Sequence, residues 1–342
     1  MSTLDRPLKI AVMSFAHTHA RGYVELLASS GSISVLTSDP GVHPEGELRG
    51  RALAESLGVD YVDTFEELLA WHPDAVIITS ENANHRAHVE LAAAAGAHIL
   101  CEKPLATTLD DGKAMLAAAE AAGVMLMVAF PVRFASTFAH LKADYDAGAL
   151  GQVLSVRGSN NGKVPSERAW FTDPTLSGGG ALVDHVVHIA DLLEALMGSA
   201  PLSVTAVTNR KLHAERAKAE TAGLVTISYA NGVIAAIDCS WSRPATAATW
   251  GGVKLTVTGT GGTVDIDFFG PRARGLDTLT GRPIESTYGP NFDEALLGTF
   301  LHAVRTGVQP QPDGNVGLRT LRIVLAAQES ALTGQTVSIT EG

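Results

Sequence analysis

The stretch Ala97-His98-Ile99-Leu100-Cys101-Glu102-Lys103-Pro104 decides how the rest of this chain is interpreted. Its apolar run, 99–101, lies between alanine-rich helical sequences and predicts a buried strand. The run ends at an acid, an amine and a proline, which fixes the backbone. Ligands of open α/β sheets bind at the carboxyl ends of the strands, so Lys103 is placed for chemistry. The alternative is that Glu102 and Lys103 are ordinary solvated charges.

The residues around this stretch alternate between strand and helix patterns. The expected strands are 8–13, 33–36, 60–62, 75–79, 99–101 and 124–129. The expected helices are 19–28, 49–57, 65–71, 85–95 and 109–122, with Thr64 as a helix cap. The repeated order predicts an α/β fold with a doubly wound parallel (Rossmann) sheet and right-handed crossovers.

The pattern changes after Phe130-Pro131 to long alternating strands. These are 152–159, 202–208, 223–229, 233–240, 253–258 and 263–269, with a hairpin at Asn231-Gly232. Helices are expected at 181–197, 291–305 and 317–333. The prediction is a dinucleotide-binding domain over 1–130. A substrate-binding and oligomerisation α+β domain over 131–342 follows, with a large, mainly antiparallel sheet. Its exposed face favours a homodimer or homotetramer.

Composition limits the function classes. The 342 residues predict two domains, and 46% hydrophobic content supplies a full core. A net charge of −11 argues against nucleic-acid or anionic-membrane partners. No apolar run reaches the length of a membrane span, and the N-terminus lacks an apolar signal core. The two cysteines, Cys101 and Cys239, are not expected to form a disulfide, which fits a cytoplasmic protein.

A dinucleotide-binding loop is expected between the first strand and the first helix. Ser14, Ala16 and His19 stand at the three positions that glycine fills in G-x-G-x-x-G. Ser14 and Ala16 are small enough for a pyrophosphate to approach, and we expect both to take ordinary φ values. Asp39 ends the second strand, where an acid accepts the ribose 2′-hydroxyl; its alternative is a turn aspartate before Pro40.

The two histidines of this loop are separated by one residue. At that spacing the rings are not expected to point the same way from a helical turn. The prediction is that His17 faces the cleft and that His19 packs between helix and sheet.

The helix expected at 181–197 carries the second chemical signal. It follows Gly178-Gly179-Gly180, and apolar residues occupy most of its circumference. Asp184, His188 and Asp191 form one polar stripe at i, i+4 and i+7. Buried carboxylates and imidazoles are costly unless they are partnered or used, so the stripe favours a functional site. The alternative is a satisfied core histidine with a capping aspartate.

In combination these motifs resemble the glucose-fructose oxidoreductase / inositol dehydrogenase (Gfo/Idh/MocA) family. The resemblance covers nearly the whole chain. It is carried by 73–78 with Asn82 and His85, by Glu102-Lys103-Pro104, by Arg133-Phe134, by 178–193, and by the closing segments 300–307 and 318–334. It implies an NAD(P)-dependent oxidoreductase that acts on a secondary hydroxyl of a sugar, a cyclitol or a related polyol.

The resemblance also implies roles for particular residues. Lys103, Asp184 and His188 would form the catalytic group, with His188 as the base and Lys103 polarising the reacting oxygen. The expected cofactor-binding residues are Ser14, Phe15, Ala16, His17, His19, Asp39, Ser80, Asn82, His85, Glu102 and Lys103. The expected substrate-binding residues are Lys103, Arg133, Trp170, Asp184, His185 and His188. NAD is the expected cofactor, NADP is the alternative, and no metal is expected.

Two departures from the family pattern keep other functions open. The glycine-rich loop is replaced, and His185 follows Asp184 where relatives often have an apolar residue. Besides a dehydrogenase with a dissociable cofactor, the chain could be a redox-neutral glycosidase or epimerase that retains NAD. It could also be a non-catalytic relative that has lost cofactor affinity. Five histidines, His17, His19, His85, His185 and His188, could lie near one cleft and bind substrate hydroxyls or, less expectedly, a metal.

Overall fold

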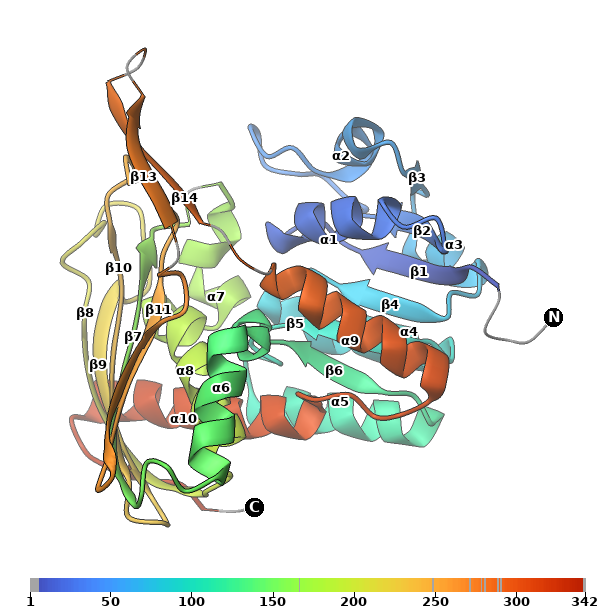
Figure 1. The fold of residues 1–342 in the computed structure, drawn as a ribbon. Helices are drawn as coiled ribbons and strands as arrows, with labels where there is room; N and C mark the ends of the chain where they lie inside the picture. Colours follow the sequence, from blue (N-terminus) through green and yellow to red (C-terminus); the bar gives the residue numbers. More distant parts are fainter. Residues whose placement is uncertain are drawn as a thin grey trace.

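The computed structural model describes residues 6–165, 167–247, 249–270, 272–277, 279, 281–287, 289 and 291–340. These residues form two large sheets with helices between and around them (Figure 1).

The first sheet has six parallel strands in the order β3-β2-β1-β4-β5-β6. The strands are β1 (Leu8–Met13), β2 (Ile33–Ser38), β3 (Asp60–Tyr61), β4 (Ala75–Ile78), β5 (His98–Glu102) and β6 (Leu126–Ala129). The connecting helices are α1 (His19–Ala28), α2 (Gly50–Leu57), α3 (Phe65–Ala70), α4 (His85–Ala94) and α5 (Leu109–Ala122). This order is that of a dinucleotide-binding doubly wound sheet, so the predicted fold class is confirmed.

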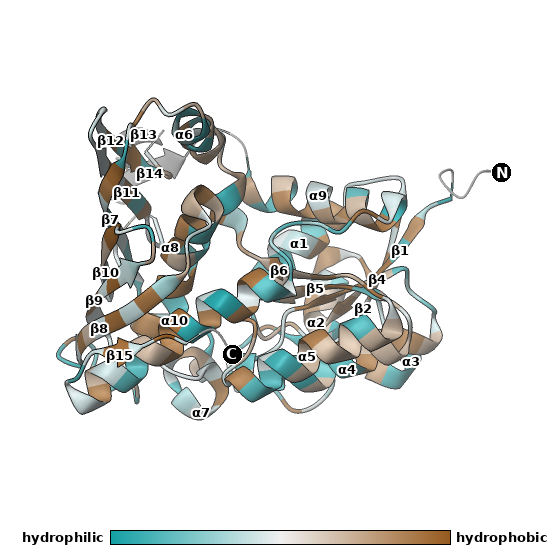
Figure 2. Cartoon of the chain, turned by 90° about the horizontal axis from the view of Figure 1, so that it is seen from below, coloured by the Kyte–Doolittle hydropathy of each residue, from teal (hydrophilic) through white to brown (hydrophobic). Residues whose placement is uncertain are grey.

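Local sequence accounts for these elements. Strands β1, β4, β5 and β6 are buried almost throughout, as apolar runs covered on both faces require, and Figure 2 shows how hydrophobic they are. Thr64 and Glu67 form a capping box at the start of α3, and Thr108 caps α5. Gly58 and Gly123 end α2 and α5 in the left-handed conformation that glycine adopts without strain.

The second sheet has seven strands in the order β12-β11-β7-β10-β9-β8-β15. They are β7 (Val153–Lys163), β8 (Pro201–Asn209), β9 (Ala222–Tyr229), β10 (Ile234–Arg243), β11 (Val253–Gly259), β12 (Gly262–Asp267) and β15 (Val337–Ser338). Neighbours pair antiparallel except β7 and β10, which are parallel. The predicted hairpin at Asn231-Gly232 joins β9 to β10.

Helices hold the two sheets together. Helix α8 (Ala181–Met197) lies on β7 and β10, and α10 (Gly314–Thr333) contacts α8, β8, α5 and β6. Figure 1 shows α10 running beneath both halves of the molecule. Helix α9 (Phe292–Thr306) packs beside α1, where Phe300 is buried against the first sheet. The second domain therefore closes over the carboxyl edge of the first sheet, where the expected site residues lie.

Several elements were not predicted from the sequence. They are α6 (Ser136–Asp146), the short α7 (Pro174–Ser177), the 3-10 turns Asn82–Asn84, Pro131–Phe134 and Ala169–Thr172, and the hairpin of β13 (Arg272–Asp277) and β14 (Arg282–Thr287). Helix α6 has a weakly apolar face with only Phe138 and Leu141 buried, which explains why periodicity missed it. Both cysteines are buried and unpaired, as expected. Among the described helices, none is long and apolar enough to cross a bilayer.

Candidate active site

The β1–α1 loop meets the end of β2 at the carboxyl edge of the first sheet. Ser14 has φ 73°, in the left-handed region, which corrects the expectation of an ordinary φ. Two hydrogen bonds hold it there: its Oγ donates to Asp39 Oδ1 (3.0 Å) and accepts from the Ala16 N–H (3.2 Å). The serine thus takes the backbone shape of the first motif glycine and offsets its strain with side-chain contacts.

Asp39 is almost fully enclosed. Its Oδ2 accepts from Gly50 N (3.0 Å) and Arg49 Nε (3.1 Å), and its Oδ1 accepts from Arg49 Nη2 (2.9 Å). Burial raises the pKa of the Asp39 carboxyl, but Arg49 outweighs it and the net pKa is lowered. The same guanidinium lies 3.2 Å from Glu81 and 3.8 Å from Glu47. This end of the site therefore carries more carboxylates than cations to neutralise them.

A cavity of about 660 Å³ opens over these groups. Ser14, Asp39, Arg49, Glu81 and His88 contribute to its lining. Beside it, α1 begins at His19 after the tight loop and offers a positive dipole end, although the His19 and Ala20 N–H groups already donate to His17. The cavity size, the compact loop and the acid after β2 fit the adenosine and pyrophosphate parts of a dinucleotide.

The second domain closes this loop from the other side. Trp170 Nε1 and Arg168 Nε both donate to the Ala16 carbonyl, at 3.0 and 3.1 Å. Ala169 N donates to Glu47 Oε1 (2.9 Å), and Trp170 stacks on Phe171 with ring centroids 3.9 Å apart. Trp170 thus lines the cofactor-side cavity and anchors the loop, so its position does not support the substrate contact expected for it.

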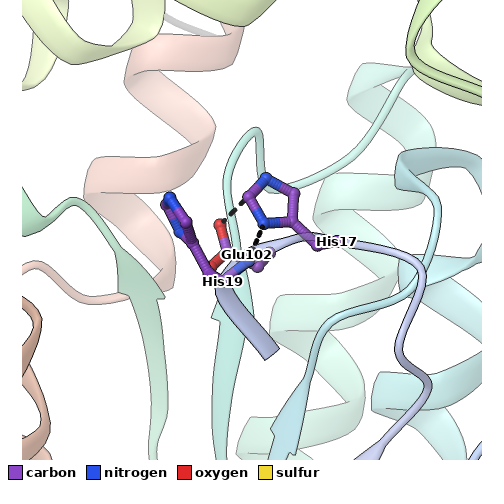
Figure 3. A group of neighbouring side chains, drawn as sticks. All are labelled: His17, His19 and Glu102. Carbon is purple, nitrogen blue, oxygen red and sulfur yellow. Dashed lines mark hydrogen bonds and ion pairs between the residues drawn. The ribbon is translucent and has the colours of Figure 1, made fainter. Parts of the chain in front are cut away.

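The side chains of His17, His19 and Glu102 lie together, as Figure 3 shows. The His17 and His19 ring centroids lie 4.3 Å apart, His19 Nδ1 is 2.9 Å from Glu102 Oε1, and His17 Nε2 is 3.9 Å from Oε2. The expectation that these rings point apart is therefore wrong. His17 precedes the Thr18 cap, so helical spacing does not govern it. His19 is not packed between helix and sheet, because about a third of its side chain is exposed.

The buried Glu102 carboxylate dominates the electrostatics of this cluster. Tyr23 donates its hydroxyl to Oε1 (2.8 Å), and Lys103 N donates to Oε2 (3.2 Å). Burial alone would raise the pKa of Glu102, but the two histidines hold it far below its usual range. Burial lowers the pKa of His17 to about 3, whereas Glu102 outweighs burial at His19 and raises its pKa. His19 is therefore the residue that shares a proton with Glu102.

These three residues also have the ligand atoms of a metal site, within 4.8 Å of one another. However, the His19 N–H donates to His17 Nδ1 (3.2 Å), so a neutral His17 carries its ring proton on Nε2. A protonated ring nitrogen has no lone pair for a metal. Metal binding at His17 Nε2 would therefore require loss of this hydrogen bond, and the contacts present favour a proton as the group that balances Glu102.

Lys103 and Asp184 form a buried ion pair between the two domains. Lys103 Nζ lies 2.7 Å from Asp184 Oδ1, and the two side chains are 5% and 8% exposed. Trp241, from β10, donates its Nε1 to Oδ2 at 3.1 Å, and His185 Nε2 lies 3.1 Å from the same oxygen. Burial would raise the pKa of Asp184, but Lys103 and His185 hold it well below its usual range. The lysine is thus fixed at the edge of the dinucleotide sheet.

A second cavity, of about 780 Å³, lies in front of this pair. His17, His19, Lys103, Asp184, His185 and His188 are all part of its lining. Nδ1 of His185 and Nδ1 of His188 are buried without a hydrogen-bond partner among the described residues, whereas Nε2 of His185 has its contact with Asp184 Oδ2. Burial, then Lys103, lowers the pKa of His188 well below its usual range, so the ring is neutral at pH 7. The site can accept a proton and bind hydroxyls.

Other expected site residues lie outside both linings. Phe15 is fully buried, and Ala16, Ser80 and Asn82 are also buried. His85 is enclosed by the carbonyls of Pro104, Leu105 and Ser80 at 3.0–3.3 Å. Arg133 is ion-paired with the buried Asp191 (2.5 Å), so neither it nor the last member of the predicted stripe is free for substrate. These positions support the walls of the site rather than its surface.

Several lining residues were not named as site residues from the sequence. Arg49, Glu81 and His88 line the first cavity; Asn160, Lys163, Arg168, Phe171 and Trp250 line the second. The Trp250-Gly251-Gly252 turn was a usable signal, since it lies in a loop between two strands and binding residues are concentrated on loops. The others depend on contacts between distant segments.

Fold and site together define an NAD-binding oxidoreductase. Two family models match: "Oxidoreductase family, NAD-binding Rossmann fold" over residues 40–130 and "GFO/IDH/MocA C-terminal domain" over residues 138–265. A D-xylose 1-dehydrogenase (NADP(+)) of Haloferax volcanii is 30% identical over 302 residues, covering 86% of this chain and 89% of the relative. The chain belongs to the Gfo/Idh/MocA oxidoreductase family.

Two further relatives support this assignment. The 1,5-anhydro-D-fructose reductase of Ensifer adhaerens is 29% identical over 301 residues, which cover 86% of this chain and 89% of the relative. The crystal structure of GenD2 from gentamicin A biosynthesis, in complex with NAD, matches with a TM-score of 0.86 at 25% identity. That match covers 99% of this chain and 98% of GenD2.

The surroundings of Asp39 predict a preference for NAD over NADP. Asp39, Glu47 and Glu81 surround Arg49 and would repel a 2′-phosphate. We expect NADP to bind about tenfold more weakly than NAD, or weaker still, in a fluorescence titration. Asp39→Ser frees Arg49 and should shift the preference toward NADP. Asp63→Ser, which breaks the exposed Arg51 pair, is the control and should leave the ratio unchanged. Tighter NADP binding by the unaltered protein would contradict this prediction.

Proposed function

We propose that this protein is an NAD-dependent dehydrogenase that acts on a secondary hydroxyl of a sugar, cyclitol or related polyol. Residues 1–130 hold the dinucleotide, and residues 131–342 supply the substrate side and the subunit interface. The observation that carries the proposal is the Lys103–Asp184 pair beside His188, at the carboxyl edge of a dinucleotide-binding sheet. The similar D-xylose dehydrogenase and anhydrofructose reductase, by their names, act on sugars.

A dinucleotide held at this edge of the sheet would supply the hydride acceptor, and oxidation of a secondary alcohol also requires removal of its hydroxyl proton. His188 is the base in this proposal, because its ring is neutral and the residue lines the second cavity beside Lys103. Lys103 holds and polarises the reacting oxygen as negative charge develops on it. Asp184 is a positioning residue, since both of its oxygens are already occupied by Lys103, Trp241 and His185.

Lys103→Met should lower kcat by orders of magnitude, because it removes the charge aimed at the reacting oxygen. The measurement is NADH formation with a panel of aldoses, polyols and inositols. Lys142→Met, on the exposed α6 pair with Asp146, is the control and should keep full activity. In Lys103→Met the Asp184 carboxylate loses its cationic partner, which could destabilise the fold. Lys103→Arg is therefore a second variant, because it keeps the buried positive charge but moves the donor atom. Its kcat should also be low.

A near wild-type rate in both Lys103 variants would remove Lys103 from the mechanism. If the purified protein carries NAD and converts sugars with no net change in NADH absorbance, the redox-neutral alternative is correct instead. If the protein binds neither NAD nor NADP at millimolar concentration, the non-catalytic alternative takes the lead.

The pH dependence of oxidation should identify the base. The ordinary pKa of histidine would give a limb near neutrality, but burial moves the pKa of His188 well below 6.5. A base must be unprotonated, so a lowered pKa keeps the enzyme active to lower pH. In the wild type kcat/KM should stay level as pH falls through 6.5 and should drop only below it. His188→Asn should lose this acid limb and about 10²–10⁴-fold in rate. An unchanged profile would transfer the role to His185 or Lys103.

We further propose that the outer face of the seven-stranded sheet forms a homo-oligomer interface. Leu154, Val207, Leu224 and Ile234 are about half exposed or more on this face, and Val207 pairs directly with Leu224 across β8 and β9. Burying such a patch contributes roughly 25 cal/mol per Å² of apolar surface. Sedimentation should show a dimer or tetramer, and Leu224→Glu should weaken it. A wild-type monomer at micromolar concentration would overturn this proposal.

A further inference from the structure

We propose that the outer end of the second cavity is a subsite for an anionic group, a carboxylate or a phosphate, carried by the substrate. The subsite is formed by Lys163 and Arg243. This inference rests on the proposed function, because it describes which polyols the same cavity selects.

The sheet places the two cations side by side. Lys163 ends β7 and Arg243 ends β10, and these two residues are register partners in the parallel pair. Both are partly buried, and Lys163 lines the cavity. Arg243 donates to Thr249 Oγ1 (2.6 Å), and its Nη2 lies 3.3 Å from where a Cβ on Gly252 would sit. Thr249 and Gly252 both line the cavity, so Arg243, which is not itself a lining residue, is held directly behind its wall.

Neither cation has an acidic partner in the part of the chain that the structure describes. Three other enclosed cations of this molecule do: Lys103 pairs with Asp184, Arg133 with Asp191, and Arg49 with Asp39. A partly buried guanidinium that is anchored only by a neutral hydroxyl retains most of its capacity to bind an anion. The chain has a net charge of −11, so an excess of cations at one end of a cavity indicates that the ligand carries negative charge there.

The acidic residue Glu167 lines the same cavity wall, but it is exposed and forms no ion pair with Lys163 within 4.0 Å. Its neighbour Arg168 is turned away toward Ala16 and Glu47. Lys163 and Arg243 together therefore outweigh Glu167 at this end of the cavity.

Trp250 connects the subsite to the reacting end. Its ring contacts His185 edge-on, with centroids 5.6 Å apart, and packs so close to Gly162 that an added Cβ would lie 2.6 Å from Trp250 Cζ3. Gly162 directly precedes Lys163. The indole, half exposed, thus lies between the His185 end and the cations, where the apolar face of a sugar ring can stack on it. The substrate would place a hydroxyl at Lys103 and His188 and its anionic group at Lys163 and Arg243.

The test compares matched neutral and anionic polyols. Glucose is compared with glucuronate and glucose 6-phosphate, and myo-inositol is compared with an inositol monophosphate. Each compound is tested as a substrate by NADH formation and as a ligand by calorimetric binding to the NADH-loaded protein. The variants are Lys163→Gln, Arg243→Gln, the conservative Arg243→Lys and the double Gln variant. Lys211→Gln, an exposed lysine beyond β8, is the control.

We expect the best substrate or ligand to be anionic, with KM or Kd rising about tenfold or more for each Gln variant. Neutral polyols should be unaffected, Arg243→Lys should retain part of the affinity, and salt should weaken only the anionic ligands. The uronate and phosphate arms identify which anion is used. Equal losses for neutral and anionic ligands, or tighter binding of neutral polyols by the wild type, would overturn the subsite while leaving the dehydrogenase intact. If the protein neither binds NAD nor turns over a substrate, but still binds anions through Lys163, only the proposed dehydrogenase function is refuted.

Discussion

The buried ion pair between Lys103 and Asp184 is the constraint on which the rest of this structure depends. Each charge is almost fully removed from water, so each would be strongly destabilising without the other, by about 3–5 kcal/mol for a broken buried pair. Lys103 is delivered by β5 of the first sheet and Asp184 by α8, which lies on the second sheet. The pair bridges the two domains, so the packing that joins the domains also assembles the site.

Further contacts hold the residues on both sides of this junction in place. Glu220 accepts from Gly180 N (2.8 Å) and Leu182 N (3.1 Å), which fixes the start of α8 and thereby the position of Asp184. Gly180 is required there because an added Cβ would lie 1.9 Å from the Glu220 carbonyl oxygen. On the other side of the junction, Trp170 and Arg168 fix the dinucleotide loop through one carbonyl, that of Ala16. Each domain therefore completes the binding surface of the other.

The sequence was most informative where structure is local. The parallel sheet, its helices and α8 follow from hydrophobic periodicity, and Lys103, Asp184 and His188 follow from motifs at the ends of such elements. What depends on contacts between distant segments was not predictable. Nothing near Arg133 indicates that its partner is Asp191, and nothing near Asp39 shows that Arg49 would occupy both of its oxygens. The converging rings of His17 and His19 depend on Glu102, which lies more than eighty residues further along the chain.

The replaced glycine loop can now be explained by this same carboxylate. A buried Glu102 needs compensation, and the nearest ammonium, that of Lys103, is already committed to Asp184. His19 and Tyr23, one turn apart on α1, supply it instead, with hydrogen bonds of 2.9 and 2.8 Å to the same oxygen. A glycine at position 19 would leave Glu102 with the Tyr23 hydroxyl, a backbone N–H and the more distant His17 ring, at 3.9 Å. The histidine is therefore part of the charge balance that keeps Lys103 free for Asp184 and for a reacting oxygen, rather than a degraded copy of the glycine motif.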